Sequence, residues 1–103
     1  MAICQIAYNP NQSPEQADQI FEQLRATGPV PPEGARLMVA GPADQGYRVI
    51  SVWDSNEARE RFLDERLAQA YEAVGLSIDD LDKTVFEVRA LVAGDLVGTP
   101  QPA

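Results

Sequence analysis

The sequence predicts a single α+β domain whose elements follow the order β-α-β-β-α-β. The prediction rests on two segments with helical spacing of apolar residues and four short strand-like runs, with breaks rich in glycine and proline among them. At 103 residues the chain has the length of one domain, and its composition, 45% hydrophobic and 23% charged, is ordinary for a globular protein. We expect the domain to span residues 1–92. Residues 93–103 lack periodicity and are expected to form a flexible tail.

Local signals define the first strand and the first helix. Residues 2–8 contain loosely alternating apolar side chains and are followed by a polar break with a proline, which predicts a strand that ends there. Ser13 can cap a helix, Pro14 suits its first position, and Gln16 completes a capping box. Gly28, free to take the left-handed conformation, is expected to end this helix. Its apolar stripe consists of Ala17, Ile20, Phe21 and Leu24.

The rest of the chain repeats the strand and helix patterns. Residues 36–40 and 47–53 are apolar runs joined by a loop with glycine and proline, which predicts a β-hairpin. Asp54 is expected to cap a second helix and Gly75 to end it. Residues 84–92 form the expected last strand. The apolar stripe of the second helix consists of Ala58, Phe62, Leu63, Leu67, Ala70, Tyr71 and Val74.

The two strand–helix–strand units predict a four-stranded antiparallel sheet in the order 4-1-3-2, with both helices on one face. The third strand is apolar on both faces, because Ile50 and Val52 point one way while Val49 and Trp53 point the other. The first strand divides in a similar way. Because two helices cover only one face, a second copy of the same sheet is expected to cover the other. We therefore predict a homodimer formed through the sheet faces.

The composition excludes several classes of function. The formal net charge is −8, from 16 acidic and 8 basic side chains, which is the opposite of what binding to nucleic acid or to an anionic membrane requires. No window has the length and apolarity of a membrane span and no signal peptide is visible, so a cytoplasmic location is expected. The chain has no histidine, the usual general base near neutral pH and a common ligand of haem and zinc. We expect neither a metal nor a cofactor.

Two other features have ordinary structural interpretations. Cys4 lies on the first strand, where we expect a small core side chain, since no positive neighbourhood that would activate a thiol is visible. Asp79, Asp80 and Asp82 lack the ligand spacing and the glycine of a calcium-binding loop. They are expected to form a solvated connection.

Residues 46–55 read Gly-Tyr-Arg-Val-Ile-Ser-Val-Trp-Asp-Ser and are followed by Glu57, Ala58 and Phe62. This segment resembles the Val-Trp-acid-Ser turn of dimeric α+β barrel proteins, in particular the antibiotic-biosynthesis-monooxygenase-like (ABM-like) domains. The resemblance covers about residues 2–92 in element order and length. It implies two ferredoxin-like sheets packed back to back as a barrel, with a pocket in each subunit between its sheet and its helices.

The resemblance also implies an activity. Haem-linked and histidine-based members of the superfamily need an imidazole, which this chain lacks. The activity that remains is that of a cofactor-independent monooxygenase-like enzyme on a small hydrophobic or aromatic substrate, in which the substrate itself reduces oxygen.

The first candidate catalytic residues are Trp53, Arg48 and Arg36. Trp53 ends its strand just before a helix, where its indole N–H can donate to a bound oxygen atom; the alternative is packing at the sheet–helix joint. Arg36 and Arg48 stand on neighbouring strands, and a cation that reaches into an apolar cavity would stabilise an enolate or a carboxylate. The alternative for each arginine is a rim ion pair with one of the 16 carboxylates.

The other candidates are aromatic or apolar. Tyr71 is the fourth expected catalytic residue, because a tyrosine hydroxyl can donate to a phenolate or a peroxide; the alternative is a structural ring on the apolar stripe. The residues expected to contact substrate are Tyr8, Tyr47, Met38, Phe62 and Phe86.

Two further functions remain open at this point. The first is a ligand-binding or scaffold dimer without chemistry, which explains the missing base equally well. The second is a small cyclase or isomerase that uses a buried carboxylate, although no acid lies on a predicted apolar stripe. A closed pocket crossed by an arginine or tyrosine would favour catalysis, whereas a pocket filled by Phe21, Phe62 and Phe86 would favour a scaffold.

Overall fold

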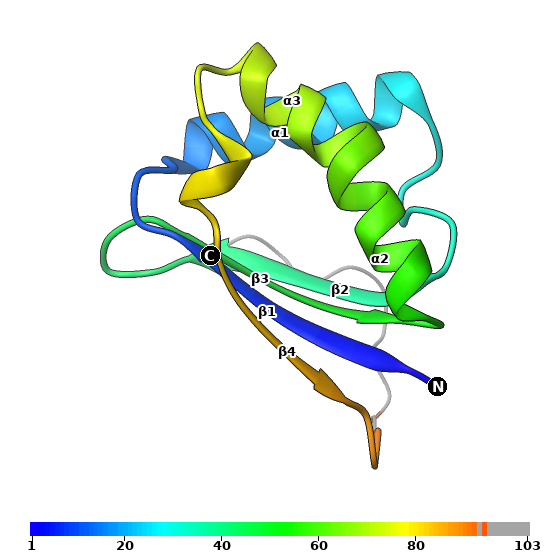
Figure 1. The fold of residues 1–103 in the computed structure, drawn as a ribbon. Coiled ribbons are helices and arrows are strands. Elements are labelled where there is room, and N and C mark those ends of the chain that lie inside the picture. Colours follow the sequence, from blue (N-terminus) through cyan, green and yellow to red (C-terminus); the bar gives the residue numbers. More distant parts are fainter. Residues whose placement is uncertain (93, 95–103) are drawn as a thin grey trace.

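A computed structural model describes residues 1–92 and 94 and shows two layers, a sheet and a set of helices packed on one of its faces (Figure 1). The elements in chain order are β1 (Ile3–Asn9), α1 (Pro14–Thr27), β2 (Ala35–Pro42), β3 (Tyr47–Trp53), α2 (Asn56–Phe62), the π-helical turn η1 (Leu63–Leu67), α3 (Ala68–Ala73), the short 3-10 turn η2 (Ile78–Asp80) and β4 (Asp82–Glu87). The predicted order β-α-β-β-α-β is confirmed. The tail expected at 93–103 lies outside the described residues, except for residue 94.

The sheet has the predicted topology. Its strand order is β2-β3-β1-β4 with every neighbouring pair antiparallel, which is the predicted order 4-1-3-2 counted from the other edge. The first hairpin strand is longer than the predicted 36–40 and contains an irregularity between Ala35 and Leu37. The last strand is shorter than predicted, because β4 ends at Glu87 and not at residue 92.

The first helix begins as the sequence predicts but ends differently. The Ser13 hydroxyl accepts from the Gln16 amide, and the Gln16 side chain accepts from the Ser13 amide, so the capping box is complete. The left-handed conformation expected for Gly28 is wrong, since its φ of 165° is ordinary extended backbone. The end of α1 is instead held by Arg66, which donates to the carbonyl of Leu24 at 2.6 Å and to that of Pro29 at 2.9 Å. The Leu24 carbonyl also accepts from the Gly28 amide and the Thr27 hydroxyl, so Arg66 adds a tie from the second helical segment to the end of α1 and the loop after it.

The second helical segment departs from prediction at its start and in its middle. Ser55, not Asp54, is the cap, with its hydroxyl accepting from the Ala58 amide, while Asp54 pairs with Arg36. The segment then runs through the π-helical turn before it stops at Gly75, whose φ is +82°. A π-helical turn inserts an extra residue and rotates the helical residues after it. It is the part of the segment from which Arg66 reaches α1.

The face of the sheet that points away from the helices is apolar, and several of its large side chains are exposed although Cys4 and Val52 on it are buried. Ile50 on β3 lies between Ile6 on β1 and Val39 on β2 in the strand register. These three side chains are 39%, 36% and 53% exposed, and Phe86 on β4 is 49% exposed. The sequence prediction of central strands that are apolar on both faces is therefore confirmed.

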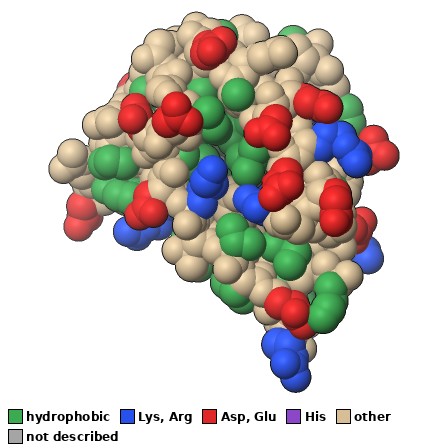
Figure 2. Space-filling model, viewed as in Figure 1, with side chains coloured by type: hydrophobic (Ala, Val, Ile, Leu, Met, Phe, Trp, Pro, Cys, Tyr) green, Lys and Arg blue, Asp and Glu red, His purple; other side chains and the backbone are tan. Residues whose placement is uncertain are grey.

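Acidic side chains are numerous on the edge of the molecule where both layers are visible. Figure 2 shows them dispersed over this surface and not gathered in one patch. Within the described residues, no helix has the length and apolar character to cross a membrane.

Candidate functional site

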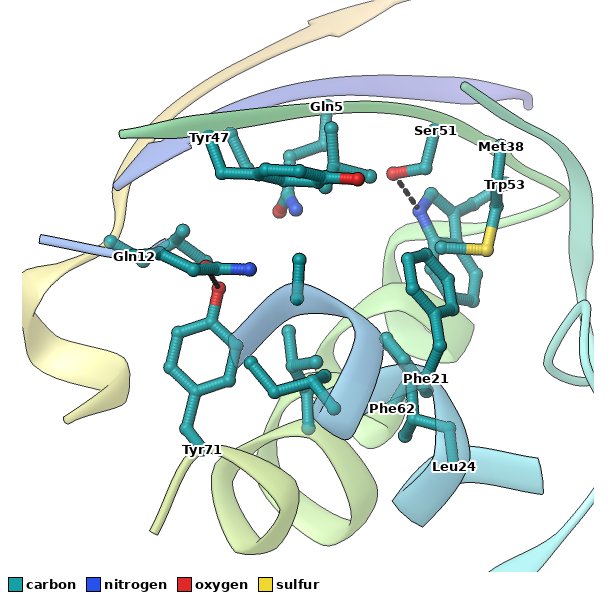
Figure 3. Close-up of a pocket in the computed structure, with 16 residues that line it drawn as sticks. Gln5, Gln12, Phe21, Leu24, Met38, Tyr47, Ser51, Trp53, Phe62 and Tyr71 are labelled. Atoms are coloured by element: carbon teal, nitrogen blue, oxygen red, sulfur yellow. Dashed lines mark hydrogen bonds between the residues drawn. The ribbon is translucent and has the colours of Figure 1, made fainter. Parts of the chain in front are cut away.

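A cavity lies between the sheet and the helices, and 16 residues line it (Figure 3). Its volume is about 40 Å³. Side chains from β1, β2 and β3 line the cavity on the side of the sheet, and those from α1 and the second helical segment line it on the side of the helices. Among the described residues, every one that lines the cavity is uncharged. Most are apolar, but Gln5, Gln12, Ser51, Tyr47 and Tyr71 place polar atoms along the wall.

Five of the predicted site residues line this cavity. Trp53, Tyr47, Met38, Phe62 and Tyr71 come from β2, β3 and the second helical segment. Met38 and Tyr47, together with Phe21 on α1, are only half-buried. The cavity therefore approaches the surface between α1 and the edge strand β2.

The structure does not bring Arg36 or Arg48 to the cavity. Arg48 points to the outer face of the sheet, and its guanidinium carbon lies 4.9 Å from the centre of the Tyr8 ring on the same face. Arg36 is exposed and forms an ion pair with Asp54, which raises the pKa of the arginine through the hydrogen bond and the charge. The expectation that these cations reach into the apolar cavity is wrong. Alternation along β3 directs Arg48 away from the face that carries Tyr47.

Tyr8 and Phe86 also lie outside the cavity. Tyr8 shares the outer face of β1 with Cys4 and Ile6, and its hydroxyl donates to the carbonyl of Gln45 at 2.6 Å. Phe86 lies opposite Cys4 in the register and so points to the same outer face. Both belong to the open apolar face and not to a substrate pocket.

Trp53 has a more constrained environment than expected. It is fully buried, its ring centre lies 5.3 Å from that of Phe62, and its indole N–H donates to the Ser51 hydroxyl at 2.9 Å. The indole is a donor only, so this bond uses its single hydrogen. The Ser51 oxygen that accepts it keeps its own hydrogen, which can be donated into the cavity.

Tyr71 closes the opposite end of the cavity. Its hydroxyl donates to Gln12 Oε1 at 3.0 Å, and burial raises the pKa of Tyr71 to about 12 although the neighbouring Asn9 side chain opposes the shift. Asn9 is fully buried, and within the described part of the chain its Nδ2 has no hydrogen-bond partner. The Tyr71 hydroxyl therefore acts as a neutral donor and acceptor at physiological pH and not as a phenolate base.

The raised pKa of Tyr71 predicts a loss of stability in alkali. The ordinary tyrosine pKa is 10, so the unfolded chain loses this proton first, and the stability that depends on protonated Tyr71 is complete below pH 10. We expect the free energy of unfolding to fall by about 1 kcal/mol per pH unit between pH 10 and pH 12. Denaturant unfolding at several pH values measures this slope, and Tyr71→Phe should flatten it. A slope that is identical in the variant would contradict the assignment.

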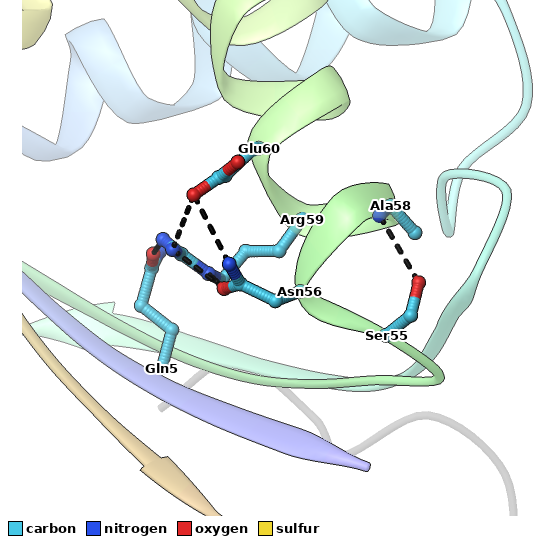
Figure 4. Close-up of polar contacts among 6 residues, drawn as sticks. All are labelled: Gln5, Ser55, Asn56, Ala58, Arg59 and Glu60. Carbon is cyan, nitrogen blue, oxygen red and sulfur yellow. Dashed lines mark hydrogen bonds and ion pairs between the residues drawn. The ribbon is translucent and has the colours of Figure 1, made fainter. Parts of the chain in front are cut away.

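Sequence reasoning missed the polar residues of the cavity. Gln5 and Ser51 occupy inward-facing strand positions among apolar neighbours, and Gln12 follows the break after β1. Arg59 stands behind Gln5 and donates to its Oε1 at 2.7 Å (Figure 4). A signal for Arg59 was present, because it precedes Phe62 by three residues and Leu63 by four, on the buried side of the helix.

The described residues do not favour chemistry based on a metal ion or on a reactive thiol. No group of three or more potential metal ligands is present among them. Burial raises the pKa of the Cys4 thiol, which keeps it protonated and makes it a poor nucleophile. Tyr47 has a raised pKa as well, because it is partly desolvated and the negative charge of Asp18 is near.

Comparisons with known proteins agree with this architecture. Neither a protein-family model nor a curated protein matches the sequence. Among solved structures, SnoaB, a cofactor-independent oxygenase from Streptomyces nogalater, is 17% identical with a TM-score of 0.61, covering 90% of this chain and 97% of that one. The chain has the fold of ABM-like domains. At this identity the likeness concerns the fold alone.

Two further solved structures share this fold. A proposed antibiotic biosynthesis monooxygenase from Deinococcus radiodurans is 22% identical with a TM-score of 0.53, over 95% of this chain and all of that one. A dimeric ferredoxin-like protein of unknown function from Jannaschia sp. CCS1 is 11% identical with a TM-score of 0.57, over 85% of this chain and all of that one. The ferredoxin-like, ABM-like fold that the Val-Trp-Asp-Ser segment implied is confirmed.

Proposed function

We propose that this ABM-like domain binds a small uncharged carbonyl compound in its cavity and oxygenates it without a cofactor. The observation that carries the proposal is the character of the wall, which is apolar and uncharged but carries hydrogen-bond donors. The Nε2 atoms of Gln5 and Gln12 have no acceptor within the described residues, and the Ser51 hydroxyl keeps a free hydrogen. Carbonyl oxygens are the acceptors that such donors recognise.

The charge pattern favours a neutral ligand over a carboxylate. In the part of the chain that the structure describes, no cation lines the cavity to balance an acid, and burying an unpaired carboxylate costs several kcal/mol. Asp18 on α1 places a negative charge close enough to Tyr47, at the half-buried side of the cavity, to raise the pKa of that tyrosine. An anionic ligand would be repelled there as well as left unpaired inside.

The reaction we propose is oxidation of an activated CH2 group to a carbonyl by dioxygen. The substrate loses a proton to give an enolate, whose oxygen the neutral donors of the cavity stabilise. The substrate carbon then supplies four electrons to one O2, which ends as the new carbonyl oxygen and one water, so no external reductant is required. A substrate acidic enough to ionise near neutral pH would not need the histidine base that this chain lacks. The similarity in fold to SnoaB, a cofactor-independent oxygenase, supports this choice of chemistry.

The single tryptophan of the chain lines the cavity and provides a direct binding test. We expect anthrone or beta-tetralone to change the fluorescence of Trp53 in a saturable way and to consume oxygen in the presence of the protein. Naphthoic acid, a carboxylate of similar size, should do neither. Equal response to the acid and the ketones would reject the proposed ligand class.

The bond between Trp53 and Ser51 predicts the effect of removing the indole N–H. In Trp53→Phe the ring remains apolar, but the Ser51 hydroxyl loses the donor that holds it at 2.9 Å. We expect the fold to persist and turnover to fall about tenfold, which corresponds to one hydrogen bond of about 1 kcal/mol or slightly more. Ser51→Ala should have a similar effect, and the double variant should lose no more than either. Unchanged turnover in Trp53→Phe would remove this pair from the mechanism.

We also propose that the open face of the sheet is covered by a second copy of the chain. Ile6, Ile50, Val39 and Phe86 expose large apolar side chains on this face, and such a patch on a small protein marks an interface. The similarity to the dimeric ferredoxin-like protein from Jannaschia supports the same arrangement. Cytoplasmic location stays a prediction from the sequence.

A second function, a scaffold or ligand-binding dimer without chemistry, is favoured by one observation. The cavity of about 40 Å³ has room for one or two water molecules, whereas a cavity that binds benzene is on the order of 150 Å³. An aromatic substrate therefore requires Met38 and Phe21 at the half-buried side to move outward. Ketone binding without oxygen consumption would favour the scaffold. A carboxylate-based cyclase or isomerase is disfavoured, because none of the described residues that line the cavity is an acid.

A further inference from the structure

We propose that Arg59 is a positioning residue that acts through Gln5 and makes the Gln5 amide the strongest hydrogen-bond donor of the cavity. This inference rests on the proposed function and assigns the part of the wall where negative charge on a ligand oxygen is stabilised. Figure 4 shows the contact at its centre, in which Arg59 on α2 meets Gln5 on β1.

The geometry of the pair is specific. Arg59 Nη1 donates to Gln5 Oε1 at 2.7 Å, and both residues are buried, with exposed fractions of 9% and 4%. Gln5 lines the cavity, whereas Arg59 does not. A guanidinium that donates to an amide oxygen draws electron density from the amide nitrogen, which makes the Nε2–H bonds more acidic. The positive charge of Arg59 thus strengthens a hydrogen-bond donor of the cavity, although the guanidinium itself does not line the cavity.

The rest of the guanidinium is held in place by the same helix. Arg59 Nε and Nη2 both donate to Asn56 Oδ1, at 3.0 Å and 2.8 Å. Asn56 Nδ2 in turn donates to Glu60 Oε1 at 3.0 Å, and Glu60 lies 3.8 Å from Arg59 Nη2. This leaves Nη1 directed at Gln5. A side chain whose donors are fixed in this way loses little entropy when it polarises a neighbour.

Other charged groups near Arg59 lie on its outer side. A surface hollow is lined by Arg59 together with Glu60, Asp64, Asp79 and Lys83. These four side chains are exposed, so water and salt screen their interaction with the guanidinium. The bond to Gln5 is buried and is not screened to the same degree. The charge of the guanidinium therefore acts more strongly on the buried Gln5 amide than on the exposed charged groups.

The test uses para-nitrophenol, whose ionisation is visible by absorbance, as a probe of the cavity. Burial in an uncharged cavity by itself raises the pKa of a phenol, so the bound pKa is compared between the wild-type protein and its variants. Arg59→Met should raise that bound pKa by about one unit, a tenfold weaker preference for the phenolate. Gln5→Leu should raise it to a similar degree, and the double variant should go no further than Gln5→Leu. Arg61→Met is the matched control, because it removes an exposed arginine two residues away and should leave the bound pKa unchanged.

Arg59→Lys separates polarisation of Gln5 from a loss of structure. Lysine can still donate to Gln5 but cannot also make the two bonds to Asn56, so an intermediate bound pKa is expected. Thermal unfolding of each variant identifies any that fails to fold, in which case Gln5→Leu and Arg59→Lys carry the test. A bound pKa that is the same in wild type, Arg59→Met and Gln5→Leu would overturn the inference.

A measurement without ligand keeps the two proposals distinct. The proposed ligand class is tested separately with the ketones, and if para-nitrophenol does not bind, the side-chain amide resonances of Gln5 decide the present inference. These signals are identified by their absence in Gln5→Leu. We expect them to be shifted downfield and to exchange slowly in the wild type, and to move toward ordinary glutamine values in Arg59→Met. Resonances that do not respond to Arg59→Met would overturn the role of Arg59.

Discussion

Ile50→Asp is expected to convert the protein from a dimer to a monomer. Ile50 lies at the centre of the open apolar face, directly opposite Ile6 on one neighbouring strand and Val39 on the other. In a back-to-back dimer an aspartate at this position would be buried without a partner in both copies, which costs several kcal/mol. We expect association to weaken roughly a thousandfold, equivalent to about 4 kcal/mol. Sedimentation at micromolar concentration measures the change.

Val85→Asp provides the matched control for the dimer prediction. Val85 and Ile50 are equally exposed at 39%, but Val85 lies opposite Gln5 and so points to the helical side of the sheet. The same aspartate there should leave the dimer intact. If Ile50→Asp and wild type sediment alike, or if the wild type is a stable monomer, the barrel arrangement is wrong.

Gly46→Ala is expected to cause a large loss of stability for the addition of a single methyl group. The φ of Gly46 is +85°, a conformation that side chains rarely adopt, and an added Cβ would lie 2.2 Å from the Asn9 carbonyl oxygen and 2.5 Å from Pro10 Cα. These neighbours are backbone atoms, so the clash cannot be relieved by rotating a side chain. We expect a loss of about 3 kcal/mol or more, combining left-handed strain with displaced backbone. For a domain of this size that lowers the Tm by roughly 15 °C.

Gly41→Ala tests whether the Gly46 effect is specific. Gly41 lies on β2, and a Cβ added to it would meet no atom within 4 Å. The free energy of unfolding of the Gly41→Ala protein should differ from that of the wild type by less than about 1 kcal/mol, since alanine loses less backbone entropy than glycine on folding. Similar destabilisation by the two substitutions would show that the contact between the hairpin loop and the end of β1 is not rigid.

The fold is predictable because its signals are local or repeated along the chain. The capping box of Ser13 and Gln16 depends on three consecutive peptide units, and the apolar stripe after it depends on helical periodicity. The strand order follows from right-handed crossovers, which hold for nearly every fold of this kind. The predicted start of the second helix is wrong by one residue because Asp54 and Ser55 are both good caps. Asp54 is engaged by Arg36, a residue 18 positions earlier.

The candidate site is predictable only in part, and the errors share one cause. Alternation along β3 correctly separates Arg48 from Tyr47 and Trp53, but alternation alone does not say which face meets the helices. The cavity lies on the other side of the sheet from Arg48, and also from Tyr8 on β1. Trp53 and Tyr71 do line the cavity, since large apolar rings at the junction of sheet and helices are buried whichever other side chains surround them.

The sequence alone determined the element order, the strand topology and the absence of histidine chemistry, because these depend on local pattern and composition. Only the tertiary structure decided which polar atoms face the cavity. Gln5 and Arg59 are 54 residues apart, and Tyr71 and Gln12 are 59 apart, so each bond exists only once sheet and helices have packed. A buried polar side chain is tolerated when a partner satisfies it, and that partner is specified by the fold and not by neighbours in the chain.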